Sequence, residues 1–112
     1  MNYDEAFKIT VGHEGGLTLN RQDRGNWTSG KVGVGELKGT KYGISAMAYP
    51  KEDIKNLTLE RAKQLYKRDY WDKCRCDELP NGLKFHVFDV AVNSGVKRAI
   101  QTLQQAAGTK DD

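Results

Sequence analysis

The chain has 112 residues, with 18 Lys and Arg against 15 Asp and Glu, which gives a formal net charge of +3. That length suits a single domain spanning residues 1–112, and so mild an excess of basic residues excludes a dedicated nucleic-acid-binding protein. No apolar stretch approaches the roughly 18 residues of a membrane-spanning helix, so we expect no stable membrane insertion.

A first amphipathic helix is predicted at the N-terminus, because apolar residues recur there at helical spacing. Either of two polar residues can cap its start, and a glycine pair stops it. Its face comprises Tyr3, Phe7, Thr10, Val11 and Glu14, its cap is Asn2 or Asp4, and its stop is Gly15-Gly16.

A glycine-rich segment follows this helix. Nine of the twelve glycines lie between Gly12 and Gly43, and the apolar periodicity fades there. Residues 15–43 are therefore predicted to form turns, short strands and exposed loops. Within them, residues 30–37 are predicted to pair as a small β-hairpin, which needs support from other segments because a two-stranded ribbon is marginal alone. After Ser45, a short helix is an open alternative to a loop.

Three further helices are predicted in the rest of the chain. Thr58 caps the first, and Pro80 lies near the start of the second, which Gly95 ends or kinks. The second is apolar enough to be the buried central helix. The predicted fold class is therefore mainly α, with a small glycine-rich loop and β-hairpin lobe after the first helix. The helical stripes comprise Leu59, Ala62, Leu65 and Tyr66; Leu83, Val87, Val90 and Ala91; and Val96, Ala99, Ile100 and Leu103.

Glu14 is the leading catalytic candidate. It is predicted to lie in the last turn of the first helix, where the negative end of the helix dipole disfavours an ionised carboxyl group. The two glycines after it allow a substrate to approach the backbone closely. Both effects would keep Glu14 protonated, as a general acid requires. The alternative is a surface glutamate at a frayed helix end.

Asp23 follows nine positions later in a polar turn that would keep it ionised. One protonated and one charged carboxyl group are what hydrolysis of a glycosidic bond needs. Alternatively, Asp23 supports its own turn through its side chain. The hydroxyl groups of Thr28, Ser29 and Thr40 could hold a water molecule or a sugar hydroxyl, or could cap turns.

Other side chains have both a functional and a structural interpretation. Aromatic residues outside the helical stripes can stack on sugar rings, although core packing is their commoner role. Basic residues around the helix that begins at Leu59 form either a solvated face or a surface for an anionic polymer. The two cysteines are interpreted as reduced thiols, and no metal site or cofactor is expected. The sets are Trp27, Tyr42, Tyr49 and Trp71; Arg61, Lys63, Lys67, Arg68, Lys73 and Arg75; and Cys74 and Cys76.

Five segments together resemble one known family. Residues 12–16 (Gly-His-Glu-Gly-Gly) are similar to the Glu-Gly-Gly signature of the glycoside hydrolase family 108 N-acetylmuramidases, a group of phage endolysins and bacterial relatives. Residues 40–45, 59–62 with 66–71, 77–80 with 87–95, and 99–104 resemble further segments of the same family, in the same order. The resemblance therefore spans nearly the whole chain.

The resemblance implies a lysozyme-like α fold and cleavage of peptidoglycan between N-acetylmuramic acid and N-acetylglucosamine, with Glu14 as the catalytic acid. The order Glu14, Asp23, Ser29 also resembles the Glu–Asp–Thr arrangement of phage-type lysozymes, with Thr28 one residue out of register. Asp23, aided by Ser29 or Thr28, would orient a water molecule. The predicted sugar contacts are Thr40, Tyr42, Trp71 and Asn93.

Two alternatives to a hydrolase stay open. A lytic transglycosylase cuts the same bond with one Glu and no positioned water. A non-catalytic wall-binding or secretion-accessory module would bind the polymer without cutting it.

The expected partner is peptidoglycan, and a monomer is expected. Because residues 1–6 lack the basic and apolar regions of a Sec signal peptide, we expect synthesis in the (host) cytoplasm and action in the periplasm after release through a holin or an exporter. The peptidoglycan-binding region of many relatives would begin just after Gly108, and we expect the catalytic domain without it.

Overall fold

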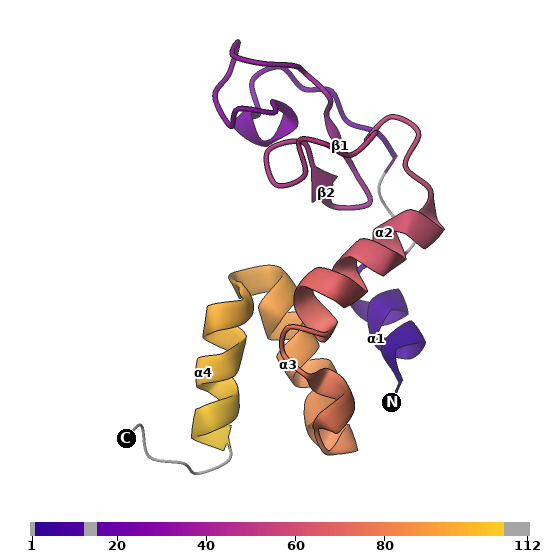
Figure 1. The fold of residues 1–112 in the computed structure, drawn as a ribbon, viewed down its shortest axis with the longest axis vertical. Coiled ribbons are helices and arrows are strands. Elements are labelled where there is room, and N and C mark those ends of the chain that lie inside the picture. The colour runs from indigo at the N-terminus through magenta and orange to yellow at the C-terminus, as the bar shows by residue number, and fades with distance from the viewer. Residues whose placement is uncertain (1, 13–15, 107–112) are drawn as a thin grey trace. The chain divides into compact units, whose positions relative to one another are not determined.

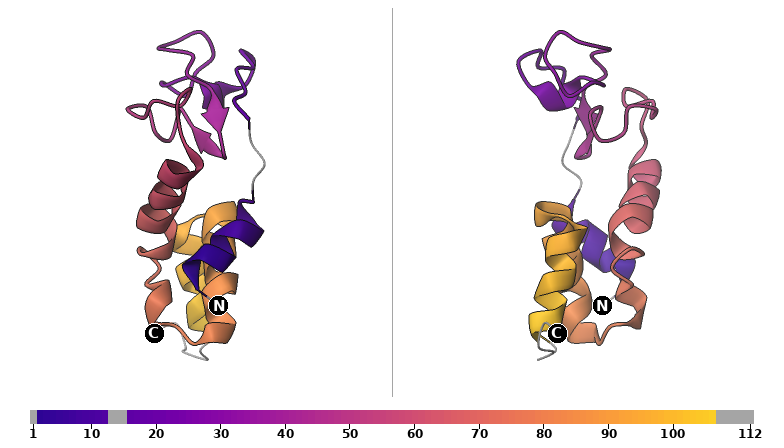
Figure 2. Two further views of the ribbon diagram at one scale, coloured as in Figure 1. Left: turned by 90° about the vertical axis from the view of Figure 1, so that its right-hand side faces the viewer. Right: turned by 60° about the vertical axis from the view of Figure 1, so that its left-hand side comes forward.

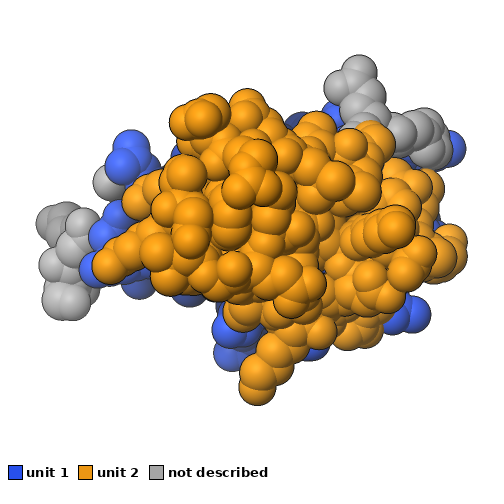
Figure 3. All heavy atoms as spheres, turned by 90° about the horizontal axis from the view of Figure 1, so that it is seen from above, with its two compact units in different colours: residues 1–12, 63–112 blue, residues 13–62 orange. Residues whose placement is uncertain are grey.

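The computed structural model describes residues 2–12 and 16–106 of the chain. It divides into two compact units, one of residues 1–12 and 63–112 and the other of residues 13–62 (Figure 3). The predicted mainly α class is confirmed, since the described residues form four α-helices and one two-stranded sheet (Figure 1). Among these residues, no helix is long and apolar enough to cross a membrane. In chain order the elements are α1 (Tyr3–Thr10), η1 (Arg24–Asn26), β1 (Thr40–Lys41), β2 (Ile44–Ser45), α2 (Leu59–Tyr66), η2 (Lys67–Trp71), η3 (Cys76–Glu78), α3 (Asn81–Ser94) and α4 (Val96–Ala106).

The helices begin and end at residues whose side chains or conformations favour it. At the start of α1, the Asn2 side chain accepts a hydrogen bond from the Glu5 N–H at 2.9 Å while the Glu5 carboxylate accepts from the Asn2 N–H at 3.3 Å, which is a capping box. Thr58 Oγ1 accepts from the Arg61 N–H at 3.1 Å and caps α2. Gly95, with φ 99°, ends α3, and α4 begins at the next residue.

α3 is the central helix of the unit formed by residues 1–12 and 63–112, as predicted. Val87, Phe88 and Ala91 are fully buried, and α3 packs against α1, η2, η3 and α4. α3 and α4 lie side by side in the views of Figures 1 and 2. An aromatic cluster joins three of these elements, with the rings of Tyr3 and Trp71 edge-on to Phe88 at centroid distances of 5.6 and 5.5 Å.

The first helix is shorter than predicted. α1 ends at Thr10, because the N–H groups of Val11 and Gly12 both donate to the Phe7 carbonyl and Gly12 adopts φ 70°. A residue with positive φ cannot continue a right-handed helix. The expected continuation of this helix to a stop at Gly15 is therefore wrong, and residues 13–15 lie outside the described residues.

The unit of residues 13–62 is built mainly from turns around a short hairpin. β1 and β2 pair antiparallel with Lys41 opposite Ile44, and the two turn residues Tyr42 and Gly43 have φ of 53° and 76°. Positive φ at both positions is the geometry of a type I′ turn, which suits the twist of a hairpin. The hairpin thus lies at residues 40–45 and not at the predicted residues 30–37, which form a loop with tight turns. A turn at residues 46–48 takes the place of the short helix considered after Ser45.

Candidate functional site

Asp23 occupies a defined and exposed position at the start of η1. Its Oδ1 accepts a hydrogen bond from the Gly25 N–H at 2.9 Å, so the side chain caps its own turn, which is the structural alternative considered from the sequence. Its Oδ2 has no hydrogen-bond partner within the described residues. The turn therefore fixes the carboxylate while leaving one oxygen available to a water molecule or a substrate.

Asn26 is the organising residue of this region, and no pattern in the sequence predicts this role. Its side chain is fully buried; Nδ2 donates to the Asn20 carbonyl at 3.0 Å, and Oδ1 accepts from the Thr40 hydroxyl at 2.6 Å. Its backbone carbonyl accepts from the N–H groups of Lys38 and Gly39. Because the Asn26 N–H also donates to the Asp23 carbonyl, one network joins the Asp23 turn to the hairpin. An asparagine in a glycine-rich segment is typical of an exposed turn, so the neighbouring residues do not predict that its side chain is buried.

Thr40 and Tyr42 lie on this hairpin. The Thr40 backbone pairs with Thr18 through two hydrogen bonds of 2.9 and 3.1 Å, and its hydroxyl donates to Asn26. Tyr42 is half-buried in the hairpin turn, with the Lys41 ammonium 5.6 Å from its ring centroid. The structure thus joins Asp23 and Thr40 in one network, with Tyr42 two residues beyond it; sugar contact by Thr40 and Tyr42 stays a prediction.

The hydroxyl groups of Thr28 and Ser29 hold the loop of residues 29–36. Thr28 Oγ1 accepts from the Glu36 N–H at 3.0 Å. Ser29 Oγ lies 2.7 Å from the Val34 carbonyl oxygen and accepts from the Lys31 N–H at 3.0 Å. Both hydroxyl groups therefore have a structural role beside the predicted catalytic one.

Trp71 corrects a prediction. Its side chain is fully buried, its Nε1–H donates to Asp77 Oδ1 at 2.9 Å, and its ring lies edge-on to Tyr3 and Phe88. A ring with no exposed face cannot stack on a sugar, so Trp71 is a core residue and not a sugar contact. An aromatic residue at the end of a helical segment is compatible with both a core position and a sugar contact. Only the packing around Trp71 decides between these two roles.

Asn93 is exposed on α3, five residues beyond the buried Phe88. Its Nδ2 donates to the Asp89 carbonyl at 2.9 Å, and Asp89 Oδ1 accepts from the Thr10 hydroxyl at 3.2 Å. These bonds link the end of α1 to α3 and leave the Asn93 side chain at the surface, where substrate contact stays a prediction.

The basic residues around α2 and η2 are largely neutralised. Five of the six form ion pairs, including Lys63 with Asp4 at 2.7 Å and Lys67 with Asp72 at 3.0 Å. This pairing favours the solvated helix face over a surface for an anionic polymer. The two cysteines are free thiols and buried, and burial raises the pKa of Cys76 to about 12. Among the described residues no cluster of side chains that could hold a metal ion is found.

Glu14 lies outside the described residues, so its catalytic role stays a prediction. A family model described as glycosyl hydrolase 108 matches residues 7–95 of the chain. The match includes every candidate site residue, from Glu14 to Asn93. A search of curated proteins returned no match.

Proposed function

The chain belongs to glycosyl hydrolase family 108 and is a glycoside hydrolase, and from this premise we propose that it hydrolyses the β-1,4 bond between N-acetylmuramic acid and N-acetylglucosamine in peptidoglycan. Glu14 protonates the oxygen of the leaving sugar as its bond to the anomeric carbon breaks. Asp23 orients a water molecule, which adds to that carbon and gives up a proton to the Asp23 carboxylate, so that each product carries one new hydroxyl group.

Family membership carries this proposal, and the geometry of Asp23 supports it. The carboxylate is held by its own turn, which the network of Asn26 supports, and its Oδ2 has no hydrogen-bond partner among the described residues. A general base has to keep such an oxygen within reach of a water molecule. Thr28 and Ser29 contribute by fixing the loop that follows.

The first experiment measures release of reducing ends from purified peptidoglycan by the wild type and by Glu14→Gln. Loss of a general acid is expected to lower the rate at least about a hundredfold. Glu60→Gln is the matched control, because Glu60 is an exposed carboxylate in the first turn of α2, and it is expected to retain full activity. A Glu14→Gln variant that is folded by circular dichroism and as active as the wild type would overturn the assignment.

A second experiment separates hydrolysis from its alternatives. Asp23→Asn keeps the turn, because an amide oxygen can still accept from the Gly25 N–H, but it removes the base. Hydrolysis predicts a loss of activity and products that have gained water, as mass spectrometry of muropeptides would show. Anhydro sugars made at an undiminished rate would indicate a transglycosylase, and co-sedimentation with peptidoglycan without new reducing ends would indicate a binding module.

We also propose that the cell wall in the periplasm is the place of action and that lysis of a host cell is the outcome. The measurement is the fall in turbidity of chloroform-treated Gram-negative cells. Wild-type protein is expected to clear the suspension and Glu14→Gln is expected to leave it turbid. Equal clearing by both proteins would contradict an enzymatic role in lysis.

A further inference from the structure

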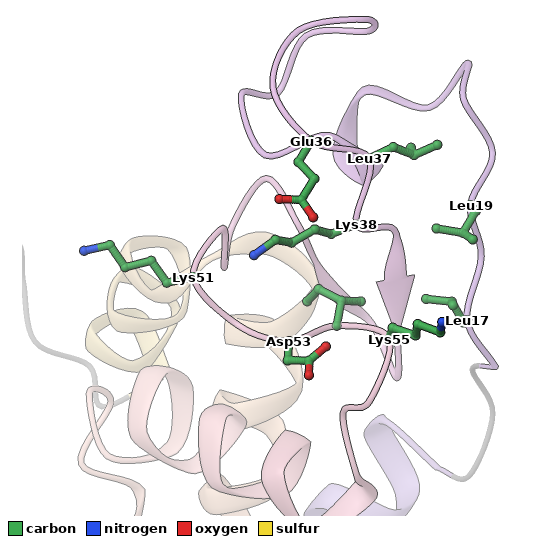
Figure 4. Close-up of a pocket in the computed structure, with 9 residues that line it drawn as sticks. Leu17, Leu19, Glu36, Leu37, Lys38, Lys51, Asp53 and Lys55 are labelled. Carbon is green, nitrogen blue, oxygen red and sulfur yellow. The ribbon is translucent and has the colours of Figure 1, made fainter.

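A pocket of about 420 Å³ lies within the unit of residues 13–62 (Figure 4), and it shares Lys38 with the network of Asn26. This volume is within the range of sites for small ligands. Its apolar wall is formed by Leu17, Leu19, Leu37 and Ile54. Leu17 and Leu19 are two positions apart on an extended segment that pairs with Thr40, so their side chains point to the same side.

Two lysine side chains brace the pocket by binding main-chain carbonyl groups. Lys38 Nζ donates to the Pro50 carbonyl at 2.7 Å, and Lys41 Nζ donates to the Lys55 carbonyl at 3.2 Å. Both bonds tie the hairpin region to residues 50–55, which carry Ile54 and the charged residues of the pocket. The pocket is therefore preformed by bonds that do not depend on a ligand.

The charges on the rim of the pocket offset one another only in part: the pKa of Asp53 is lowered by its hydrogen bond with Asn56 and then by the nearby ammonium groups of Lys38 and Lys55. The ammonium groups of Lys51 and Lys55 have no hydrogen-bond or ion-pair partner within the described residues. Asp53 is held by Asn56, whose Nδ2 donates to it at 2.9 Å. Glu36 supplies a second carboxylate, so the pocket offers cations and anions beside an aliphatic wall. Figure 4 shows Leu17 and Leu19 on one side, with Lys38 and Asp53 across from them.

We propose that this pocket binds the peptide stem of peptidoglycan, an inference that rests on the proposed function. None of its nine lining residues is aromatic, so it lacks the flat apolar surface on which a sugar ring stacks. The glycan strand itself is uncharged where its lactyl groups are joined to peptide. The stem carries the free carboxylates together with alanyl methyl groups, which match ammonium groups beside an aliphatic wall.

The pocket would then select glycan strands that carry a peptide stem, while the hydrolytic residues act on the sugar. The rim lysines provide attraction and orientation, and the leucines bury the alanyl side chains. Glu36 and Asp53 favour stems that carry an amino group, such as those containing diaminopimelate, over stems that are purely acidic.

The test is an NMR titration of the whole chain with the soluble tripeptide L-Ala-γ-D-Glu-meso-diaminopimelate, with chitotriose as the neutral sugar probe. The tripeptide is expected to shift the amide signals of Leu19, Leu37 and Lys55, and chitotriose is expected to leave them unchanged. Lys55→Glu is expected to weaken tripeptide binding about fivefold, because an attractive rim charge becomes a repulsive one.

Lys31→Glu is the matched control, because Lys31 is an exposed lysine of the same unit outside the pocket. It is expected to bind the tripeptide like the wild type. Equal weakening by both variants, absence of shifts at the pocket, or the same shifts with chitotriose would overturn the proposal. Binding is measured without catalysis, so a protein that binds the tripeptide but cuts no glycan would refute the proposed function and not this inference.

Discussion

The two units of this protein are stabilised by different means. Residues 1–12 and 63–112 bury aromatic rings between helices, as at Tyr3, Trp71 and Phe88. Residues 13–62 also bury apolar side chains such as Trp27 and Ile44, but they add a buried amide at Asn26, backbone hydrogen bonds between loops, and glycines with positive φ. Helices satisfy their own backbone groups, so their packing can be apolar, whereas loops need partners from elsewhere in the chain. The candidate carboxylate Asp23 and the pocket both belong to the second kind of structure.

The largest effect is expected from Trp71→Ala, which removes the largest fully buried side chain of the helical unit. The loss of packing should lower the free energy of unfolding by about 3–5 kcal/mol. Urea unfolding followed by far-ultraviolet circular dichroism measures it. Trp71→Phe should cost less, because it keeps one aromatic ring and so loses only part of the packing together with the bond to Asp77. A cost below about 1 kcal/mol for Trp71→Ala would contradict a packed aromatic core.

Gly39→Ala tests whether the loop unit depends on close approach of backbone segments. Gly39 has φ 90°, and an added Cβ would collide with the Thr18 carbonyl oxygen. Strain and steric conflict together should cost about 2–4 kcal/mol in thermal or urea unfolding. Gly33→Ala is the matched control, because Gly33 has φ 82° but open space around it, and only the backbone strain of about 1–2 kcal/mol is expected. Equal costs at both positions would show that the contact with Thr18 is unimportant.

Asn26→Ala should destabilise the loop unit locally. It leaves the Asn20 carbonyl and the Thr40 hydroxyl without their partner, at a cost of about 2 kcal/mol. Amide hydrogen exchange should accelerate at Lys38 and Gly39, whose N–H groups donate to the Asn26 carbonyl, while Phe88 in the helical unit stays protected. Acceleration at Phe88 to the same degree would mean that the two units unfold together.

The smallest expected effect is a decline in the stability of the helical unit at alkaline pH. Burial raises the pKa of Cys76 and of Tyr66 to about 12 each. The folded protein therefore keeps protons that the unfolded chain releases from about pH 8.5 for a thiol and about pH 10 for a phenol. Stability from these groups is fully present below those values and is lost as the pH rises toward 12. Urea unfolding at pH 7, 9 and 10.5 should show this decline, with a shallower slope for Cys76→Ala. Identical slopes would show that the thiol does not contribute.

Much of the helical unit could be predicted, because a helix depends mainly on residues that are neighbours in the sequence. Apolar spacing located α2, α3 and α4, and single residues such as Thr58 and Gly95 marked where they begin and end. The same reasoning placed the end of α1 too late, since the positive φ of Gly12 ends it before the glycine pair. Five segments, from residues 12–16 to residues 99–104, were sufficient together to indicate the family, which the family match over residues 7–95 then confirmed.

Only the tertiary structure decided which polar and aromatic side chains are buried. Asn26 and Thr40 are 14 positions apart and Thr18 and Thr40 are 22 apart, so their hydrogen bonds leave no periodic pattern in the sequence. Trp71 has the residue type of a sugar contact, but the packing of Tyr3 and Phe88 around it makes it part of the core. The sequence by itself determined the helices and the kind of chemistry, because these depend on neighbouring residues. Burial and hydrogen-bond partners depend on residues distant in the chain, which meet only when the chain has folded.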